Sequence, residues 1–351
     1  SSPRLRPGVG EIYLYNTPKQ IIGDVFVKTS FRKKKLEVEL NIPQSGNYTV
    51  SNQILLCGKK IFSLPDAKNR GGDLKVASIW RNPVLWGPVK FPLLQLKTTL
   101  KDSSGKVLDV KNTRFGFREI WIKGKEYYLN GNPVRFRIAT GYAMSKDMSI
   151  AFFKDMKDLG ENSVELLDAD VAKTYDIREM LDAADENGIM IFYLLPGVNK
   201  LTQTWHDENA RRAWIKKLKS SVNAIKNHPS IVQWGMNFNL LGYPLDLEPR
   251  RIGMNYYPSK TSSPGVKWKV AKASQDILKK IDPTRPTYHH AGGNYGEAHT
   301  SNLYLCFCPL QEKSEWPKIW AKKGVKPFMP IELGTPFENT YDFDRKTKAL
   351  H

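Results

Sequence analysis

Residues 176–195 read Asp-Ile-Arg-Glu-Met-Leu-Asp-Ala-Ala-Asp-Glu-Asn-Gly-Ile-Met-Ile-Phe-Tyr-Leu-Leu, and this stretch decides the fold class. Asp176 with Glu179 three positions later forms a capping box of the aspartate type, which predicts the start of a helix. Gly188 is the residue type that most often follows the end of a helix. The apolar run 189–195 is typical of a parallel strand that is buried on both faces. A helix followed by such a strand indicates an α/β domain.

The same alternation continues toward the C-terminus. Asp207 is expected to cap a helix whose apolar residues recur at spacings of three and four and which Pro229 ends. Two more helices are predicted at 266–281 and 316–323. Seven strands are predicted, at 134–139, near 165–168, and at 189–195, 231–236, 287–290, 302–307 and 328–332. Strand–helix alternation over about 230 residues favours a (β/α)8 TIM barrel over an open sheet. The eighth strand is not visible before His351, so we expect the barrel to be incomplete at its C-terminal end.

The N-terminal third has a different rhythm. Strand-like runs at 21–30, 35–42, 47–56 and 93–101 are rich in Val, Ile, Thr, Phe and Tyr and are separated by Pro and Gly. Turn signals at this spacing predict a small antiparallel β-sandwich over residues 19–118.

Composition narrows the range of functions. The 351 residues are 40% hydrophobic and 25% charged, as in an ordinary globular protein, and no apolar stretch is long enough to span a bilayer. The formal net charge of +19 favours polyanions at long range, either nucleic acid or a sulfated or uronate-rich polysaccharide, although a basic surface also aids solubility. Nucleic acid is disfavoured because the basic residues are dispersed and no DNA- or RNA-binding motif is present.

The three cysteines, Cys57, Cys306 and Cys308, are too few for a disulfide framework. The spacing of Cys306 and Cys308 is also poor for zinc, so we interpret these two as packing residues. We expect no metal and no cofactor.

Residues 328–336 read Phe-Met-Pro-Ile-Glu-Leu-Gly-Thr-Pro, an apolar run that ends in a single carboxylate, Glu332. In a barrel, the C-terminal tips of the strands face the active site. Glu332 therefore stands either where a reacting group would stand, or at a strand end where it pairs with a surface lysine.

Four motifs together resemble glycoside hydrolase family 2, the group of β-galactosidases, β-glucuronidases and β-mannosidases. They occur in the family's order, at residues 114–120 (Arg-Phe-Gly-Phe-Arg-Glu-Ile), 128–134 (Tyr-Leu-Asn-Gly-Asn-Pro-Val), 227–234 (Asn-His-Pro-Ser-Ile-Val-Gln-Trp) and 326–334 (Lys-Pro-Phe-Met-Pro-Ile-Glu-Leu-Gly). The resemblance implies that residues 1–18 are a remnant of a jelly-roll sugar-binding domain. It further implies that 19–118 form an immunoglobulin-like sandwich and that 119–351 form the catalytic barrel.

The resemblance also implies that Glu332 is the catalytic nucleophile. The family ends its fourth strand in Gly-Asn-Glu, whose Glu is the acid/base, whereas here the aligned residues are Asn237-Phe-Asn239. An amide has no proton to give at neutral pH, so Asn239 cannot be a Brønsted acid. The chain is therefore expected to represent a divergent branch of the family.

If the enzyme is active, its proton donor must come from elsewhere. The candidates are Glu312, Glu297 and whichever of His289 and His290 points into the barrel, with a structural histidine as the alternative. Asp168, at the second strand tip, fits an acceptor of sugar hydroxyls. The remaining residues expected to bind substrate, or else to pack in the core, are Asn237, Asn239, Tyr142, Trp205, Trp234 and Tyr304.

The main functional hypothesis is a retaining exo-β-glycosidase that acts on a galactose-, glucuronate- or related β-linked glycan, and the charge points to an acidic or sulfated one. The alternative is a carbohydrate-binding pseudo-glycosidase, which the loss of the acid/base suggests. We expect an oligo- or polysaccharide partner, no membrane, and assembly with further copies of the chain. A secreted or periplasmic location is expected, with any signal peptide removed or upstream of Ser1.

Overall fold

The computed structural model describes residues 18–166, 176–241, 252, 263–303 and 310–333. Contacts divide the chain into two compact units. Unit 1 comprises Ser1–Glu119, Phe136–Ile191 and Asn223–Ile231, and unit 2 comprises Ile120–Arg135, Phe192–Val222 and Val232–His351. The predicted remnant domain at 1–18 lies almost wholly outside the described residues.

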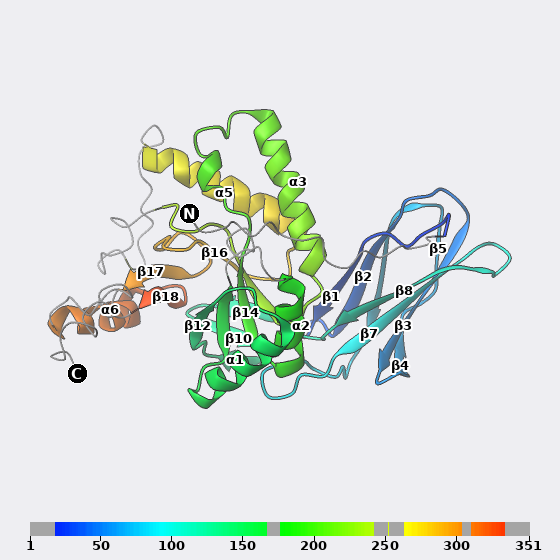
Figure 1. The fold of residues 1–351 in the computed structure, drawn as a ribbon, viewed down its shortest axis with the longest axis horizontal. Coiled ribbons are helices and arrows are strands. Elements are labelled where there is room, and N and C mark those ends of the chain that lie inside the picture. Colours follow the sequence, from blue (N-terminus) through cyan, green and yellow to red (C-terminus); the bar gives the residue numbers. More distant parts are fainter. Residues whose placement is uncertain (1–17, 167–175, 242–251, 253–262, 304–309, 334–351) are drawn as a thin grey trace, which may run out of the picture. The chain divides into compact units, whose positions relative to one another are not determined.

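Unit 1 begins with a β-sandwich of two antiparallel sheets. One sheet has the order β1-β2-β6, and the other has the order β4-β3-β7-β8 with β5 paired to β3 (Figure 1). The strands are β1 (Val25–Ser30), β2 (Lys35–Ile42), β3 (Tyr48–Leu56), β4 (Lys59–Ser63), β5 (Ala67–Asn69), β6 (Gly72–Ile79), β7 (Leu94–Lys101) and β8 (Val107–Phe115).

The sandwich forms because its strands alternate in polarity. In β2, every second residue is buried, and Leu36, Val38 and Leu40 join Val50 and Leu96 of the opposite sheet in one core. Alternation of this kind is what a half-buried strand requires, and the all-β prediction for this region is confirmed. The first strand starts at Val25 and not at 21, because the backbone N–H groups of 21 and 22 bind side-chain oxygens instead of a neighbouring strand.

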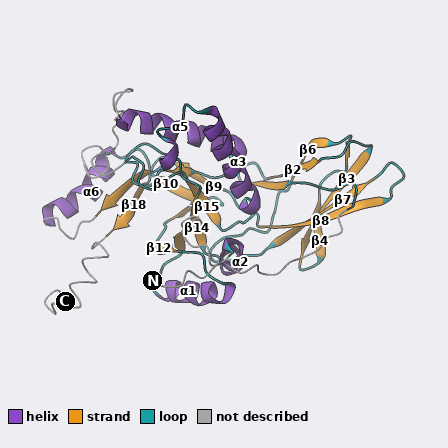
Figure 2. Ribbon diagram, turned by 45° about the horizontal axis from the view of Figure 1, so that its top comes forward, coloured by secondary structure: helices purple, strands orange, loops and turns teal. Residues whose placement is uncertain are grey.

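The region after the sandwich carries parallel strands and helices (Figure 2). A short antiparallel sheet comes first, with β9 (Ile120–Lys123), β10 (Glu126–Leu129) and β11 (Asn132–Val134). Seven strands follow, namely β12 (Ile138–Gly141), β13 (Ser163–Leu166), β14 (Met190–Leu194), β15 (Ile231–Gly235), β16 (Thr287–Tyr288), β17 (His299–Leu303) and β18 (Phe328–Leu333). The helices are α1 (Lys146–Asp158), α2 (Ile177–Asn187), the short η1 (Asn199–Leu201), α3 (Glu208–Ile225), α5 (Ser263–Ile281) and α6 (Leu310–Lys323).

The deciding stretch folds as its sequence predicts. The Asp176 carboxylate accepts a hydrogen bond from the Arg178 backbone N–H (2.9 Å), which caps α2. Gly188 ends the helix with a φ of 67°, a left-handed conformation that glycine adopts at no steric cost. A side chain there would also meet the ring of Phe91, since an added Cβ would lie 2.8 Å from it. Asp207 likewise caps α3, accepting from the Asn209 N–H (2.8 Å).

The described parallel strands form two sheets and not a closed barrel. Five hydrogen-bond in the order β12-β13-β14-β15-β16, whereas β17 and β18 pair only with each other. The expected strand at 287–290 shrinks to two residues, because the chain turns after Tyr288 and reaches a left-handed φ of 52° at Ala291. Thr300 at the start of β17 ties down this turn, its hydroxyl donating to the His289 carbonyl (2.6 Å) and accepting from the Gly292 N–H (2.8 Å). The next strand consequently begins at His299 and not at Asn302, and residues 304–307 of the predicted strand lie outside the described residues.

Unit 2 has an aromatic core with one buried ion pair. The Trp234 ring meets Tyr193 edge to face, and its Nε1–H donates to Asp282 (2.8 Å). Asp282 is also bound by Arg285 (2.6 Å), and both side chains are almost fully buried. Burial raises the pKa of Asp282, but the Arg285 charge and the hydrogen bonds from Thr284 and Trp234 outweigh it and hold that pKa below its usual value. Among the helices in the described ranges, none is long and apolar enough to cross a membrane.

Replacing Arg285 with methionine should destabilise the protein, because Asp282 would be left charged and buried without its cation. The expected loss in the free energy of unfolding is about 3–5 kcal/mol, measured by urea unfolding at pH 7. The loss should shrink as the pH falls through the pKa of the stranded carboxylate, which burial without a cation raises above the usual aspartate value of about 3.9. Lys272→Met is the matched control, because it breaks the exposed Lys272–Asp276 pair, worth about 0.5 kcal/mol at most. Equal effects of the two substitutions would contradict this account.

Candidate active site

Four strand ends of unit 2 bring polar side chains together around Glu332. Asn239 follows β15, His290 follows β16, and Asn302 near the end of β17 is the register partner of Glu332 in β18. Parallel strands end at the same edge of a sheet, which places these groups within reach of one another. Glu332 keeps 25% of its side chain exposed, while Asn302 and His290 are buried.

The Asn239 side-chain amide joins this group. Its Nδ2 donates to Glu332 Oε1 (3.3 Å), and its Oδ1 accepts from Asn302 Nδ2 (3.3 Å) and meets His290 Nδ1 (2.8 Å). Two donors on the oxygen fix the orientation of the amide and turn its N–H toward the carboxylate. We refer to Asn239, His290, Asn302 and Glu332 as the Glu332 cluster.

The tautomer of His290 follows from these contacts. An amide oxygen can only accept, so Nδ1 carries the proton and Nε2 presents a lone pair. That Nε2 lies 3.7 Å from Glu332 Oε1. Burial lowers the pKa of His290 to about 3, so the ring is neutral at pH 7. Two acceptors this close suit a ligand that donates to both, such as a sugar hydroxyl.

The second imidazole belongs to a separate network. His289 Nδ1 meets Asn237 Nδ2 (2.6 Å), and its Nε2 meets Gln275 Oε1 (2.8 Å), so Nε2 carries the proton and Nδ1 accepts. Burial, reinforced by the positive charge of Lys326, lowers the pKa of His289 to about 3. The two neighbouring histidines thus contact different residues, as alternation along an extended segment predicts. Asn237 is fully buried and its Oδ1 has no hydrogen-bond partner among the described residues.

An exposed aromatic ring lies beside the Glu332 cluster. The Phe238 ring is 47% exposed and packs against the His290 ring, with 4.4 Å between centroids and a tilt of 35° between the ring planes. Its position is set by the backbone, since Asn199 Nδ2 donates to the Phe238 carbonyl (2.5 Å) and Asn239 has a left-handed φ of 49°. Asparagine tolerates this conformation better than most residues do. An exposed ring at the edge of this polar cluster offers an apolar surface to a bound ligand.

The other predicted site residues are distributed as follows. Glu297 accepts from the Thr287 N–H (2.7 Å) and pairs with Lys279 (2.7 Å), at the amino end of β16, and has no recorded contact with Glu332. Trp205 packs edge to face on Trp214, and Tyr142 is an exposed residue of unit 1. Glu312 lies in α6 with its side chain outside the described part. Asp168 and Tyr304, and also Cys306 and Cys308, lie outside the described residues.

Two members of the site escaped sequence reasoning. Asn302 was placed at the start of a strand and not near its end, so it gave no sign of facing Glu332. The sequence feature that could have identified Asn302 is the polar pair Ser301-Asn302 within a strand. The structure buries both side chains fully. Phe238 sat inside the aligned tripeptide but was not singled out, although an aromatic residue between two asparagines at a strand end is unusual for a core position.

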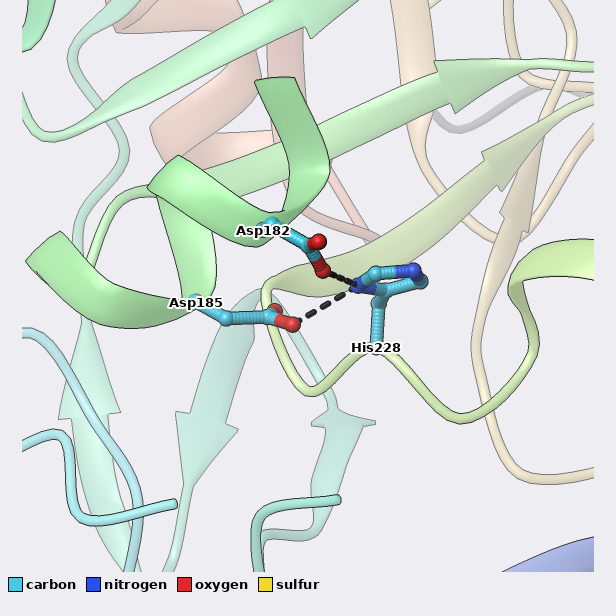
Figure 3. A group of neighbouring side chains, drawn as sticks. All are labelled: Asp182, Asp185 and His228. Atoms are coloured by element: carbon cyan, nitrogen blue, oxygen red, sulfur yellow. Dashed lines mark hydrogen bonds and ion pairs between the residues drawn. The ribbon is translucent and has the colours of Figure 1, made fainter. Parts of the chain in front are cut away.

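One group in unit 1 has the composition of a metal site. Asp182 and Asp185 of α2 both point toward the same ring nitrogen of His228, whose Nδ1 is 2.7 Å from Asp185 and 3.8 Å from Asp182 (Figure 3). The Arg114 guanidinium of β8 already binds both carboxylates, and the Ser230 N–H donates to Asp185 (3.0 Å). A metal ion would have to displace this cation, so we interpret the group as an ion-pair cluster that holds α2 to the sandwich.

Comparison with known proteins identifies the fold. The model of the family described as glycosyl hydrolases family 2 matches residues 20–118. The β-glucuronidase of Homo sapiens is 22% identical over 341 residues, which cover 94% of this chain and 48% of that protein. A putative β-glucuronidase of Formosa agariphila is 28% identical over 261 residues, covering 67% and 29%. The chain therefore spans about half the length of the Homo sapiens protein and less than a third of the Formosa agariphila protein.

Solved structures agree in fold. A β-glucuronidase of Bifidobacterium dentium complexed with coumarin-3-O-glucuronide superposes with a TM-score of 0.66 at 16% identity, over 90% of this chain and 53% of that one. A family 2 β-galacturonidase of Eisenbergiella tayi bound to galacturonate gives 0.63 at 19% identity, over 89% and 56%. The model of glycosyl hydrolases family 2 thus matches the sandwich domain, and the chain as a whole is similar in fold to solved structures of that family.

The imidazoles of His289 and His290 should stay neutral across the physiological range. Their NMR signals, assigned with His289→Gln and His290→Gln, should not shift between pH 5 and 8, whereas in urea-unfolded protein they should titrate near pH 6.5. Because the unfolded state binds protons that the folded state refuses, both rings should lower stability as the pH falls from about 6.5 toward 3. A folded-state midpoint near 6.5 for either ring would contradict the burial that the structure assigns.

Proposed function

We propose that this protein cleaves β-glycosides with Glu332 as the nucleophile, by the retaining route. The observation that carries the proposal is the Glu332 cluster, a partly exposed carboxylate at a strand end whose recorded hydrogen-bond donor is the Asn239 amide (3.3 Å). A glutamate carboxylate at this place can attack an anomeric carbon. The neighbouring His290 Nε2 and the Phe238 ring would bind a sugar hydroxyl and an apolar sugar face.

The family match supports the rest of this proposal. The match to residues 20–118 supports a sandwich domain that ends near residue 118, followed by a catalytic domain. Likeness to β-glucuronidase structures supports closure of the parallel strands into a barrel in the whole protein. We also propose that cleavage is exo-acting. The same proposal places the protein outside the cytoplasm, either secreted or periplasmic, and assembles it with other copies of the chain.

Glu332→Gln should abolish release of nitrophenol from nitrophenyl β-glycosides, because an amide cannot form the glycosyl ester. A panel of glucuronide, galacturonide, galactoside and mannoside covers the sugars named for the relatives. The matched control is Glu208→Gln, which neutralises an exposed glutamate paired with Arg212 on α3. Glu208→Gln should retain wild-type rates. Undiminished activity in Glu332→Gln would refute the assignment of the nucleophile.

We further propose that the substrate is an anionic polysaccharide. The members of the Glu332 cluster other than Glu332 are neutral. The net charge of +19 would therefore attract parts of the polymer that lie far from the cleaved bond. Long-range attraction of this kind raises the rate of encounter and is screened by salt.

Raising the salt concentration from 0.05 to 0.5 M should therefore increase KM for a sulfated or uronate oligosaccharide about tenfold or more, by screening exposed charge. KM for a nitrophenyl galactoside, which is small and uncharged, serves as the internal control and should change little. Equal salt dependence of the two substrates would count against an anionic glycan.

A carbohydrate-binding pseudo-glycosidase is the second candidate, and Asn239 is the observation that favours it. In that case sugar would still bind at the Glu332 cluster, but no glycoside would be cleaved. Isothermal titration with the free sugars, alongside the nitrophenyl panel, separates the two functions.

A further inference from the structure

The chain between β14 and α3 (Figure 1) is connected to the Glu332 cluster by direct contact. The connection from a parallel strand to the helix that follows it lies at the carboxyl edge of the sheet, which is the edge where the Glu332 cluster gathers. Asn199 fixes the segment there, because its Nδ2 donates to the Phe238 carbonyl (2.5 Å) and the Phe238 ring packs against His290. Other side chains of this segment are therefore candidates for contact with a ligand that extends beyond the cluster.

Trp205 is a half-buried aromatic residue near the end of this segment. Its ring meets Trp214 of α3 edge to face, with 5.7 Å between centroids. Trp214 is anchored in turn, since it is buried and its Nε1–H donates to the Pro196 carbonyl (3.0 Å). Trp205 is thus held on one side while part of the residue stays accessible. The apolar C–H face of a sugar can pack on an aromatic ring of this kind.

Arg211 places a positive charge at the same residue. Its Nη1 donates to the backbone carbonyl of Trp205 (3.4 Å) from near the start of α3. A guanidinium has five N–H donors in a planar fork, and this neutral carbonyl takes up one of them. Arg211 is half-buried, and no carboxylate in the described ranges pairs with it. A cation in this setting suits a carboxylate or sulfate group, which accepts hydrogen bonds from the fork.

The neighbouring arginine has a different environment. Arg212 is exposed and pairs with Glu208 one turn earlier in α3 (3.0 Å). Successive residues of a helix are rotated by about 100° about its axis, so the two arginines leave α3 in different directions. Arg211 and not Arg212 is therefore the arginine that contacts the segment joined to the Glu332 cluster.

We propose that Trp205 and Arg211 form a second sugar-binding subsite, which holds a carboxylate- or sulfate-bearing unit of the glycan beyond the unit bound at the Glu332 cluster. The Trp205 ring packs on the sugar, and the Arg211 guanidinium binds its anionic group. This inference rests on the proposed function and deepens it, because it names the residues that recognise the anionic part of the substrate. Recognition then depends on a local contact in addition to the net charge of +19.

Isothermal titration calorimetry in the Glu332→Gln background, in which the glycan is not cleaved, tests the subsite. The probes are a hyaluronan tetrasaccharide, which carries carboxylates, the same compound with its carboxylates reduced to alcohols, and a chondroitin sulfate tetrasaccharide. Arg211→Gln should weaken binding of the two charged compounds about tenfold or more, because a hydrogen-bonded charge pair is lost. Binding of the reduced compound should change less than about twofold, the range expected without such a pair. Trp205→Ala should weaken all three, since packing on the ring does not depend on charge.

Arg212→Gln is the matched control, because it removes the same charge from the next residue of α3. It should change binding of each tetrasaccharide less than about twofold, as expected for an exposed ion pair. Arg211→Lys keeps the charge but not the planar fork, so its affinity for the charged compounds should fall between those of Arg211 and Arg211→Gln. Circular dichroism checks that each variant is folded, and Arg211→Lys carries the test if Arg211→Gln is not.

Three outcomes would overturn the inference. Equal weakening of the charged and reduced tetrasaccharides by Arg211→Gln would show that Arg211 only holds the segment in place. Equal effects of Arg211→Gln and Arg212→Gln would show that net charge, and not a local contact, attracts the glycan. Failure of either charged compound to bind when Trp205 and Arg211 are intact would remove the proposed ligand.

The same titrations separate the two anionic groups. Weakening of both charged tetrasaccharides by Arg211→Gln would support recognition of the carboxylate, whereas weakening of the chondroitin sulfate compound alone would support recognition of the sulfate. Cleavage of nitrophenyl glycosides, measured separately, decides whether Glu332 is the nucleophile. Failure of the subsite and failure of the proposed function therefore give different results.

Discussion

The side-chain amide of Asn239 is the contact on which the arrangement of the candidate site depends. Its oxygen is held by His290 and Asn302, and its nitrogen reaches Glu332, so one group joins the ends of four strands. The same contacts decide the His290 tautomer and, with it, that Nε2, 3.7 Å from Glu332 Oε1, carries the lone pair. Loss of this amide would leave Asn302 and His290 to find new acceptors in a buried place, where an unsatisfied donor costs about 1–3 kcal/mol.

This arrangement has both a structural and a chemical side. The left-handed backbone at residue 239 suits asparagine, and the amide N–H donates to the Glu332 carboxylate. A glutamate at 239 would bring a second negative charge toward Glu332 and would lose the N–H that donates to Glu332. The family's usual acid/base and the observed hydrogen-bond network are therefore alternatives at this position, which is why the substitution of one residue bears on the entire reaction.

Much of the fold could be predicted from sequence because local signals there agree with one another. The Asp176 cap, Gly188 and the apolar run after it fix a helix and a strand without reference to the rest of the chain. Local signals could not predict whether the barrel closes. The turn that shortens β16 is held by a hydrogen bond from Thr300 to the carbonyl of His289, eleven residues away. Glu332 and Asn239 were found because the resemblance supplied their motifs. Asn302 was missed because strand register, and not any motif, brings it opposite Glu332.

The claim tested most directly is that Glu332 attacks the anomeric carbon. Incubation with 2-deoxy-2-fluoro glycosides of the sugars named for the relatives, followed by peptide mapping by mass spectrometry, identifies the residue that carries the glycosyl group. The account predicts a single labelled peptide containing Glu332, with the ester on that side chain. A label on a different carboxylate would contradict it.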